Sequence, residues 1–393
     1  MAVSGKRTAS NALAVRSANL LAVLACLRDG RAMSTPDLGE ALQLHLSTVT
    51  RLMAVLRRAG LVEPERGANS SPAVGRPPTH WRMVRDAGYA LGLALHPGRV
   101  SGVVTDLTGH RLSCEAATFD PHLRPRDLPH ALTQFVDRLL RGLDRERVLG
   151  LGCAASGVVD PATGVLLLSG ALLSDDDVPV VDFPLRDYLA ELFPWPVHVA
   201  NDANVGGLAV FKRLVRQGQI PPDGSLFYAM AVDDLWGFGC GLVVRGVPYA
   251  GAHGAAGEII HPRLTLWRPP PEGLATQALA GDAESMRAIM GYLVPVIEHL
   301  AALAVSLDPD RIVLGGAFAT VGDPFRSEFE RVLRTTLPFD SFLTGISRAG
   351  VLMDPLWPDT VAVGAAETVL DGLFEPQANG EPTALVRMAL EAG

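Results

Sequence analysis

The chain has 393 residues, too many for one compact core, so we expect two or three domains. Its 48% hydrophobic and 19% charged residues are typical of a globular protein, and no apolar run reaches membrane-spanning length, so we expect no membrane partner. The net charge of −8 is unevenly spread, because residues 1–86 carry 12 Lys and Arg against 6 Asp and Glu, a balance of +6. The remaining residues carry 22 against 36, a balance of −14, which suggests a basic head for an anionic partner.

Three helices are predicted in this basic head. Apolar residues at i, i+3, i+4 and i+7 over residues 20–27 predict an amphipathic helix that ends at Gly30. Thr35 followed by Pro36 is a typical N-cap and first-turn pair, and it opens a short second helix. Ser47 is expected to cap a third helix. Three helices with one tight turn between the second and third match the helix-turn-helix plan, in which the third helix lies in the major groove.

The outer face of the third helix carries the side chains expected to contact DNA. Short hydroxyl groups and an arginine near the helix start suit base edges, and two arginines near its end suit phosphates. In chain order these residues are Ser47, Thr48, Thr50, Arg51, Arg57 and Arg58. A plain three-helix bundle with a solvated polar face is the alternative interpretation.

The next segment reads as a wing. Residues 61–63 and 81–84 are predicted strands that flank a loop of Gly, Ser and Pro. The returning arm carries Gly75-Arg76-Pro77-Pro78, a rigid extended segment that we expect to place Arg76 in a narrow minor groove. A proline-stiffened linker is the alternative. We therefore assign residues 1–86 to a winged helix-turn-helix DNA-binding domain.

The body repeats one strand pattern. Residues 89–96 and 99–106, followed by a strand from Arg111, read as strand, turn, strand, turn, strand. Residues 225–232 and 238–245 repeat this plan, and each set is followed by helices and a further strand. Two related α/β halves are the plan of the actin-like and sugar-kinase superfamily, which has a ribonuclease H-like fold. Its nucleotide phosphates lie between the two hairpins.

We expect the two lobes to divide inside this repeated pattern. The smaller α/β lobe is assigned to residues 87–206 and the larger α/β lobe to residues 207–380. A C-terminal helix at about residues 381–393 is expected to pack back on the smaller lobe.

Several motifs make the likeness specific. Residues 201–204 read Asn-Asp-Ala-Asn, residues 251–261 are a glycine-rich segment that ends in Glu-Ile-Ile-His, and Asp308-Pro309 leads into a buried strand. With the winged head and Gly75-Arg76-Pro77, these motifs resemble the ROK family (repressors, open reading frames and kinases) over essentially the whole chain. Kinase members of that family generally lack the head, so the resemblance places this chain among the transcriptional regulators.

The resemblance implies a sugar-binding site. Asp202 matches the family's aspartate that takes the hydroxyl proton during phosphoryl transfer, and Asn201 stands beside it as a hydroxyl partner. Glu258 and His261 match two further sugar contacts, and Gly157 matches a backbone contact. A vicinal diol suits a carboxylate paired with an amide or a neutral imidazole, so we expect these five residues to bind a sugar or sugar derivative.

The phosphate side departs from the family pattern. The kinases' Asp-x-Gly-Gly-Thr is replaced by residues 94–98, Ala-Leu-His-Pro-Gly, so the acid is lost and Pro97 has no N–H for a phosphate. His96 is a poor substitute for a hard oxygen ligand of Mg²⁺, and Leu235-Trp236 fill a Gly-Thr place in the second hairpin. We therefore expect no ATP turnover, no catalytic residue and no cofactor.

The ligand-binding residues depart from the family pattern in two further respects. Ala171 and Ala275 stand where the family has an asparagine and a second glutamate, so the site is expected to be larger or less polar. The family's cysteine-rich zinc loop is replaced by residues 267–273, which contain no cysteine. The chain's four cysteines are dispersed without a Cys-x-x-Cys pair, so we expect no metal site and a reduced, cytoplasmic location.

The sequence thus predicts a cytoplasmic, sugar-responsive repressor of carbohydrate uptake or catabolism genes. Its expected partners are a double-stranded DNA operator, a sugar or sugar derivative, and further copies of itself in a homodimer or higher homo-oligomer. An ATP-dependent sugar kinase that also binds DNA is one alternative. An activator or a ligand-independent regulator is the other.

Overall fold

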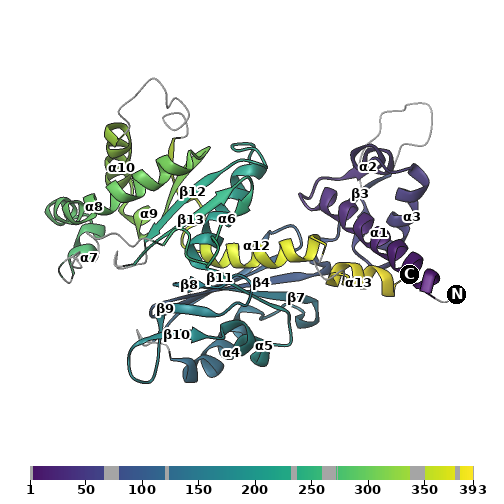
Figure 1. Ribbon diagram of the computed structural model, residues 1–393, viewed down its shortest axis with the longest axis horizontal. Coiled ribbons are helices and arrows are strands. Elements are labelled where there is room, and N and C mark those ends of the chain that lie inside the picture. The colour runs from purple at the N-terminus through teal and green to yellow at the C-terminus, as the bar shows by residue number, and fades with distance from the viewer. Residues whose placement is uncertain are drawn as a thin grey trace.

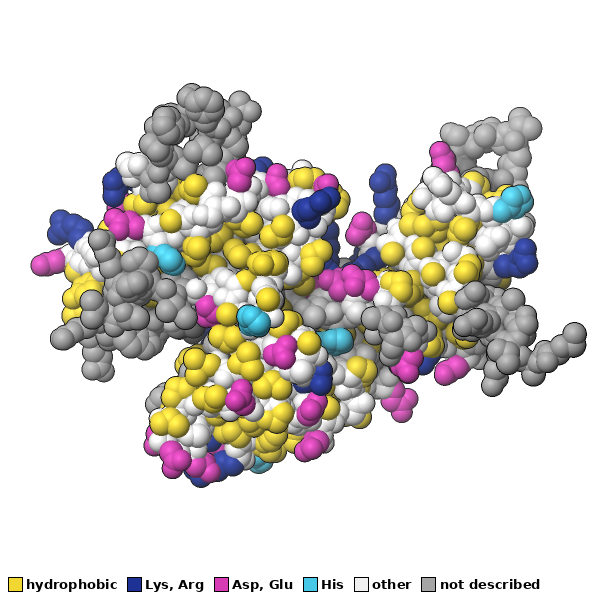
Figure 2. Space-filling view, viewed as in Figure 1, with side chains coloured by type: hydrophobic (Ala, Val, Ile, Leu, Met, Phe, Trp, Pro, Cys, Tyr) yellow, Lys and Arg dark blue, Asp and Glu magenta, His cyan; other side chains and the backbone are white. Residues whose placement is uncertain are grey.

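The structure is a computed structural model with a small helical head and two α/β lobes (Figure 1). In the space-filling view, hydrophobic and charged side chains are interspersed over the face shown (Figure 2). The described residues are 3–65, 79–119, 124–231, 237–258, 271, 273–336, 350–376 and 381–392; for residues 3–12, 170, 171, 279 and 336 only the backbone is described.

The head is a winged helix-turn-helix domain, as predicted. Its helices are α1 (Val3–Leu27), α2 (Thr35–Leu42) and α3 (Leu46–Arg58). An antiparallel sheet of order β1-β3-β2 completes it, formed by β1 (Met33–Ser34), β2 (Val62–Pro64) and β3 (His80–Met83). Leu24, Leu38, Met53 and Leu56 are fully or almost fully buried between the three helices. The apolar periodicity of the sequence therefore gives the helical core directly.

The helix caps differ from the expected ones. Ser34, and not Thr35, caps α2, because its hydroxyl accepts a hydrogen bond from the Asp37 amide at 3.3 Å while Asp37 accepts from the Ser34 amide at 3.1 Å. This reciprocal pair is a capping box. His45, and not Ser47, occupies the N-cap of α3 with extended backbone, and its Nδ1 accepts from the Ser47 amide at 3.5 Å.

The smaller lobe contains a five-stranded sheet of order β11-β7-β4-β5-β6. Its strands are β4 (Tyr89–His96), β5 (Arg99–Asp106), β6 (Arg111–Thr118), β7 (Val148–Ala155) and β11 (Val197–Asn201). A second, three-stranded sheet consists of β8 (Val158–Val159), β9 (Leu166–Leu173) and β10 (Pro179–Phe183). The helices associated with this lobe are α4 (Leu128–Leu139), α5 (Leu185–Leu192) and α12 (Thr360–Phe374).

The two faces of β4 carry side chains of different size, and this decides what covers each face. Leu91, Leu93 and Leu95 share a hydrophobic core with α4 and α5. The opposite face carries small residues and packs against α12. At Gly92 a Cβ atom would lie 2.0 Å from the carbonyl oxygen of Ala362, so only glycine lets α12 approach this closely.

The larger lobe repeats this arrangement. Its sheet has the order β14-β13-β12-β15-β16, formed by β12 (Leu226–Ala231), β13 (Phe238–Val244), β14 (Val247–Pro248), β15 (Arg311–Gly316) and β16 (Val351–Met353). On one face lies α6 (Asp202–Arg216), packed on β12 and β13. The other face packs against α7 (Leu274–Leu279), α8 (Ala283–Leu307), α9 (Ala317–Val321) and α10 (Asp323–Thr336). The predicted duplication of the strand pattern is confirmed.

The two central helices, α6 and α12, pack against each other between the lobes (Figure 1). The expected lobe boundary at residue 206 therefore falls inside α6. Residues 360–374, expected in the larger lobe, instead cover the sheet of the smaller lobe as α12. Neither helix was predicted from the sequence, and hydrophobic periodicity does not specify which sheet each one covers, because both are apolar on more than one side.

The C-terminal helix α13 (Ala384–Glu391) packs on the head, which corrects the expectation that it returns to the smaller lobe. It contacts α1, α3 and the preceding α12. Leu385, Val386 and Ala389 are buried in the same hydrophobic cluster as the helices of the head. The C-terminal helix of the chain therefore packs on its N-terminal head (Figure 1).

One helix corrects the expectation that no segment is long and apolar enough to cross a membrane. By length and composition alone α8, with 25 residues, meets that criterion. Within the lobe, however, Ile289, Val296 and Leu300 of α8 are fully buried against the sheet and its neighbouring helices. A core helix of a globular domain passes the same test.

Candidate functional site

A polar cluster lies where β7 and β11 end, at the N-terminus of α6. Asn201 is the N-cap of α6, and its side-chain oxygen accepts from the Asn204 amide at 3.0 Å. Its Nδ2 donates to the Gly157 carbonyl at 2.9 Å and to Glu258 Oε1 at 3.4 Å. The structure therefore brings together Gly157, Asn201, Asp202 and Glu258, four of the five predicted sugar-binding residues. The fifth, His261, lies outside the described residues.

The carboxylate of Asp202 is buried and well supplied with donors. Its Oδ1 accepts from the Ala203 amide at 2.8 Å, and its Oδ2 accepts from the Ser156 hydroxyl at 2.5 Å. His96 Nδ1 lies 3.8 Å from the same Oδ2 and 3.3 Å from Ser156 Oγ. The sequence indicates His96 only as a poor substitute for an Mg²⁺ ligand and gives no indication of Ser156. Only their positions point to these two residues, because His96 ends β4, Ser156 directly follows β7, and both strand ends border Asp202.

Glu258 is positioned by a close backbone approach. Glu258 forms an isolated β-bridge with Gly239, and the Cys240 amide donates to the Gly257 carbonyl at 3.1 Å. Gly257 has φ +86°, and a Cβ atom there would lie 2.0 Å from the Cys240 carbonyl oxygen. Any other residue at 257 would push this segment off β13, and would move Glu258 away from Asn201.

The environment of Glu258 favours its neutral form. Burial, with a smaller contribution from the negative charge of Asp202, raises its pKa from 4.5 to about 7. Near neutral pH this carboxyl group is therefore both a possible donor and a possible acceptor, whereas an ordinary surface glutamate only accepts. Such a group can serve a ligand hydroxyl in either role.

The raised pKa of Glu258 predicts a measurable dependence of stability on pH. Between pH 4.5 and about 7 the folded protein keeps a proton that the unfolded chain releases. Stability should therefore fall as pH rises through this range, by up to about 1.4 kcal/mol per pH unit from this group. Urea denaturation of wild type and Glu258→Gln at several pH values tests this. The variant should lack this component, and an identical pH profile in both proteins would contradict it.

The predicted DNA-contacting face is largely exposed. Ser47, Thr50 and Arg51 near the start of α3, and Arg57 and Arg58 at its end, are exposed, as expected of an outer face. Thr48 has intermediate exposure and lies next to the buried Val49. Arg76 lies outside the described residues.

Two arginines of this face are expected to act differently. Arg51 lies in the first turns of α3, where a recognition helix meets base edges, and Arg57 lies in the last turn. Arg51→Ala should reduce the preference for operator over random DNA by about 1–3 kcal/mol. Arg57→Ala should instead weaken binding to all DNA sequences by about the same factor. Fluorescence anisotropy at several salt concentrations separates the two. An equal loss on all sequences for Arg51→Ala would show that Arg51 contacts only phosphate.

The comparisons with known proteins agree with this arrangement. Residues 97–276 match the model of the ROK family, and residues 18–66 match the IclR helix-turn-helix domain. The chain carries a ROK domain behind an IclR-type helix-turn-helix domain. It resembles a crystal structure described as a ROK family transcriptional regulator, a homolog of the E. coli MLC protein, with 18% identity and a TM-score of 0.70 over 96% of this chain and 100% of that one.

Sequence relatives include regulators. A protein called y4fQ from Sinorhizobium fredii is 27% identical over 85% of this chain and 86% of its own length. The xylose repressor of Caldicellulosiruptor bescii is 24% identical over 64% of this chain and 60% of its own length. The match thus spans less than two thirds of that repressor. A ROK family glucokinase from Streptomyces griseus, solved with glucose and AMPPNP, shares the fold with 21% identity and a TM-score of 0.56 over 72% of this chain and all of that one.

The ROK domain departs from the kinase pattern where nucleotide phosphates would lie. The turn that follows β4 is formed by Pro97 and Gly98, and His96 ends the strand beside Asp202. Ala275, which replaces a family glutamate, lies on α7, half-buried against the lobe core. Leu235-Trp236, the side chain of Ala171 and most of residues 267–273 lie outside the described residues.

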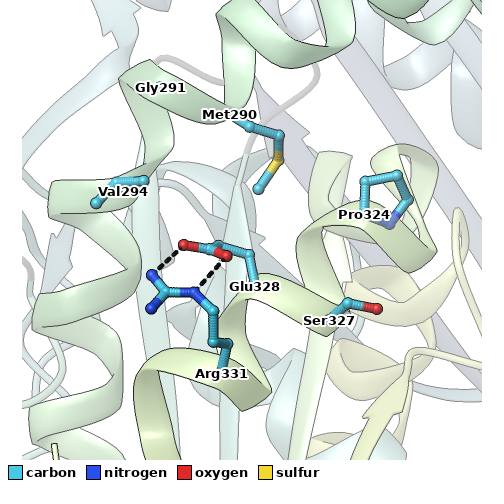
Figure 3. Close-up of a pocket in the computed structure, with 7 residues that line it drawn as sticks. All are labelled: Met290, Gly291, Val294, Pro324, Ser327, Glu328 and Arg331. Carbon is cyan, nitrogen blue, oxygen red and sulfur yellow. Dashed lines mark hydrogen bonds and ion pairs between the residues drawn. The ribbon is translucent and has the colours of Figure 1, made fainter. Parts of the chain in front are cut away.

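A separate pocket lies in the larger lobe between α8 and α10 (Figure 3). It has a volume of about 470 Å³, and Met290, Val294 and Pro324 contribute apolar walls. Arg331 and Glu328, both on α10, form an ion pair in its lining, with donor–acceptor distances of 2.6 and 2.8 Å. None of its lining residues belongs to the polar cluster around Asp202, so we do not assign the sugar to this pocket.

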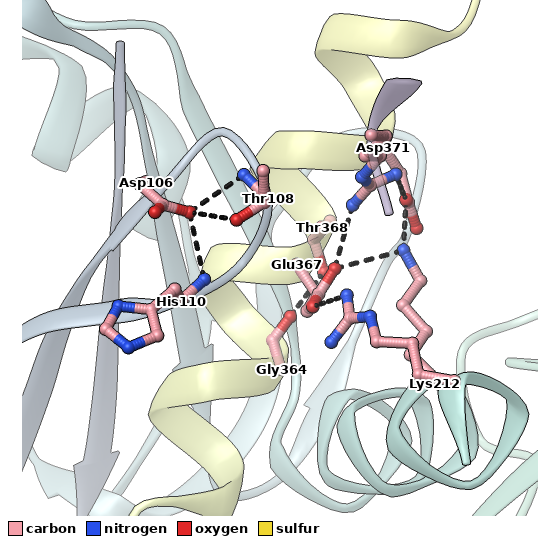
Figure 4. A network of polar contacts seen from close by, with 10 residues as sticks. Asp106, Thr108, His110, Lys212, Gly364, Glu367, Thr368 and Asp371 are labelled. Atoms are coloured by element: carbon pink, nitrogen blue, oxygen red, sulfur yellow. Dashed lines mark hydrogen bonds and ion pairs between the residues drawn. The ribbon is translucent and has the colours of Figure 1, made fainter. Parts of the chain in front are cut away.

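A buried carboxylate connects the ROK domain to the head (Figure 4). Glu367 on α12 is 1% exposed and accepts from three cations: Arg28 at 2.8 Å, Lys212 at 3.2 Å and Arg216 at 2.5 Å. Asp371, one turn later, pairs with Arg28 and Lys212. Arg28 follows α1 of the head, while the other two cations come from α6. We call these five residues the Glu367 cluster.

The Glu367 cluster and the polar cluster lie toward opposite ends of one helix. Asp202 begins α6, and Lys212 and Arg216 lie in its last two turns, about 15–20 Å farther along the axis. A rigid displacement of α6 at the polar cluster would therefore also move the cations that share Glu367 with the head. Sequence reasoning missed this connection, since the paired residues are more than 150 positions apart.

Proposed function

We propose that this protein is a cytoplasmic, sugar-responsive transcriptional repressor whose head binds a double-stranded DNA operator. The observation that carries the proposal is the grouping of Gly157, Asn201, Asp202 and Glu258 at the start of α6, in a chain that also carries a helix-turn-helix domain. The existence of xylose repressors among the sequence relatives supports a carbohydrate signal. Genes of carbohydrate uptake or catabolism are the corresponding targets.

In this proposal the polar cluster binds sugar hydroxyl groups. Asp202 accepts hydrogen bonds from them, and Glu258, with a pKa of about 7, donates or accepts according to the hydroxyl it meets. Asn201 is held by its own cap hydrogen bond, which fixes the direction in which its amide faces the ligand. Several such bonds in a partly buried site give specificity, because a missing hydroxyl leaves a protein group unpaired.

The signal then reaches the head through α6. A sugar changes operator affinity only if it binds two conformations of the protein unequally. We propose that these conformations differ in the position of α6 relative to α12, and that the Glu367 cluster passes the difference to Arg28. The burial of α13 against α1 and α3 gives the ROK domain a second contact with the head. A homodimer, which we also propose, would convert this movement into a change in the spacing of two heads.

We propose that the chain does not transfer phosphate. Ala94 stands where the kinases have their phosphate-site acid, and His96, two residues later, lies beside Ser156 and Asp202. An imidazole paired with these groups is a poor Mg²⁺ ligand. Asp202 keeps the position of the family's base, so an ATP-dependent sugar kinase that also binds DNA is the second candidate.

The experiment is a binding screen of the full-length protein. Isothermal titration calorimetry with a panel of free monosaccharides that includes D-xylose and D-glucose is expected to find a ligand whose addition releases operator DNA. A coupled ATPase assay with the same panel is expected to show no turnover. Sugar-dependent ATP consumption would favour the kinase. Operator binding that no sugar alters would favour a ligand-independent regulator, and operator binding strengthened by sugar would contradict release.

A further inference from the structure

The DNA-facing side of α3 contains a large exposed hydrophobic side chain that the polar residues do not explain. Leu46 is the first residue of α3, and its side chain is 51% exposed. The opposite face of the helix already supplies the core, since Val49, Met53 and Leu56 are buried. Leu46 therefore contributes little to the core of the head, and about half of its side chain is open to a contact outside the chain.

Leu46 belongs to a stripe of methyl-bearing residues. Thr50 and Ala54 follow it at i+4 and i+8, both exposed, so the three lie above one another on one side of the helix. The Thr50 hydroxyl donates to the Leu46 carbonyl at 2.8 Å, which engages its polar group and leaves its methyl group for other contacts. We call Leu46, Thr50 and Ala54 the apolar stripe of α3.

The polar residues beside the stripe orient it toward DNA. Arg51 donates through Nε to the Ser47 carbonyl at 3.2 Å, so its side chain is partly held against the helix. Arg57 and Arg58 add positive charge in the last turn, where phosphates are contacted in this class of domain. An apolar stripe flanked by arginines on a recognition helix has one natural complement in the major groove, the 5-methyl group of thymine.

We propose that Leu46 is a specificity-determining residue that packs on a thymine 5-methyl group in the operator. Thr50 and Ala54 extend this apolar contact along the same side of α3. The inference rests on the proposed function as a DNA-binding regulator and deepens it, since it assigns a base preference to a residue that forms no hydrogen bond with DNA. It predicts at least one thymine in each half-site beneath the start of α3.

The test removes one methyl group at a time from the DNA. The highest-affinity duplex is first recovered by selection with the full-length protein from a randomised pool. Each thymine of that duplex is then replaced singly by deoxyuridine, which lacks only the 5-methyl group. For wild type we expect one thymine per half-site whose replacement weakens binding about three- to fivefold, as the loss of one buried methyl group implies. Leu46→Ala should bind the unmodified duplex more weakly and be insensitive to that replacement.

Leu13→Ala is the matched control, because Leu13 on α1 is 48% exposed and lies away from α3 in the sequence. It should keep the wild-type pattern of sensitivity. No sensitive thymine for wild type, or the same sensitivity in Leu46→Ala, would overturn the inference while leaving DNA binding intact. A change of oligomeric state in Leu46→Ala with an unchanged thymine pattern would overturn it too, by placing Leu46 in a protein interface. Failure of wild type to select any duplex would instead contradict the proposed function.

Discussion

Asp202→Asn should weaken sugar binding by about tenfold to a hundredfold while leaving operator binding by the sugar-free protein nearly unchanged. The substitution removes a charged acceptor, and a hydrogen bond to a charged group contributes about 1.5–3 kcal/mol. The fold should tolerate it, because an asparagine oxygen can still accept from the Ala203 amide and the Ser156 hydroxyl can accept from the new amide group. Calorimetry with the sugar identified by the screen measures the loss.

The control for this prediction is Asp187→Asn, which changes an exposed aspartate of α5 and should leave sugar affinity unchanged. The kinase alternative predicts a different outcome. A catalytic base is needed for turnover and not for binding, so Asp202→Asn would then abolish phosphorylation at unchanged affinity. That result, with turnover in wild type, would contradict the proposed role of Asp202.

Glu367→Gln should destabilise the protein by roughly 3 kcal/mol, because it leaves three cations around a neutral side chain in a buried position. Burial alone would raise the pKa of Glu367, but Lys212, Arg216 and Arg28 outweigh it and lower the pKa below 4.5. A lowered carboxyl pKa contributes stability above about pH 4.5, and this contribution is lost as pH falls through the pKa in the folded protein. Urea denaturation at pH 7 and below pH 4 should therefore show a smaller difference between wild type and variant at the lower pH.

Asp137→Asn provides the comparison, since its ion pair with Arg145 is about half-exposed on both sides. An exposed pair contributes about 0–1 kcal/mol, so this variant should be close to wild type. A loss of similar size in both variants would show that Glu367 has no special role.

Arg28→Met separates stability from coupling. We expect it to fold, since Lys212 and Arg216 still neutralise Glu367, and to respond less to sugar in operator binding.

Local structure followed closely from the sequence in the strands that border the site. β4 and β5 have the predicted bounds, because two eight-residue segments with several Leu, Val or Ala residues each are separated by Pro97-Gly98, which leaves little freedom in where the hairpin turns. The helix caps were less predictable. Ser34 and Thr35 are both good capping residues, and the choice of Ser34 depends on Asp37 standing three residues later.

Tertiary relationships were less accessible from the sequence. The grouping of Asn201, Asp202 and Glu258 was expected only through the family resemblance, since no local pattern links residues in separate elements. His96 and Ser156 join them because β4 and β7 are parallel neighbours that end together. The Glu367 cluster and the docking of α13 on the head depend on which faces of apolar helices meet, and hydrophobic periodicity does not specify the partner.

The central claim is that sugar and operator binding are coupled through the chain, and a reciprocal titration tests it most directly. Operator affinity is measured by fluorescence anisotropy with and without saturating sugar, and sugar affinity by calorimetry with and without saturating operator duplex. Coupling requires the two affinities to change by the same factor, typically about 5- to 150-fold, and release requires both to weaken. We predict this result for wild type. Tight sugar binding that leaves operator affinity unchanged would contradict the account.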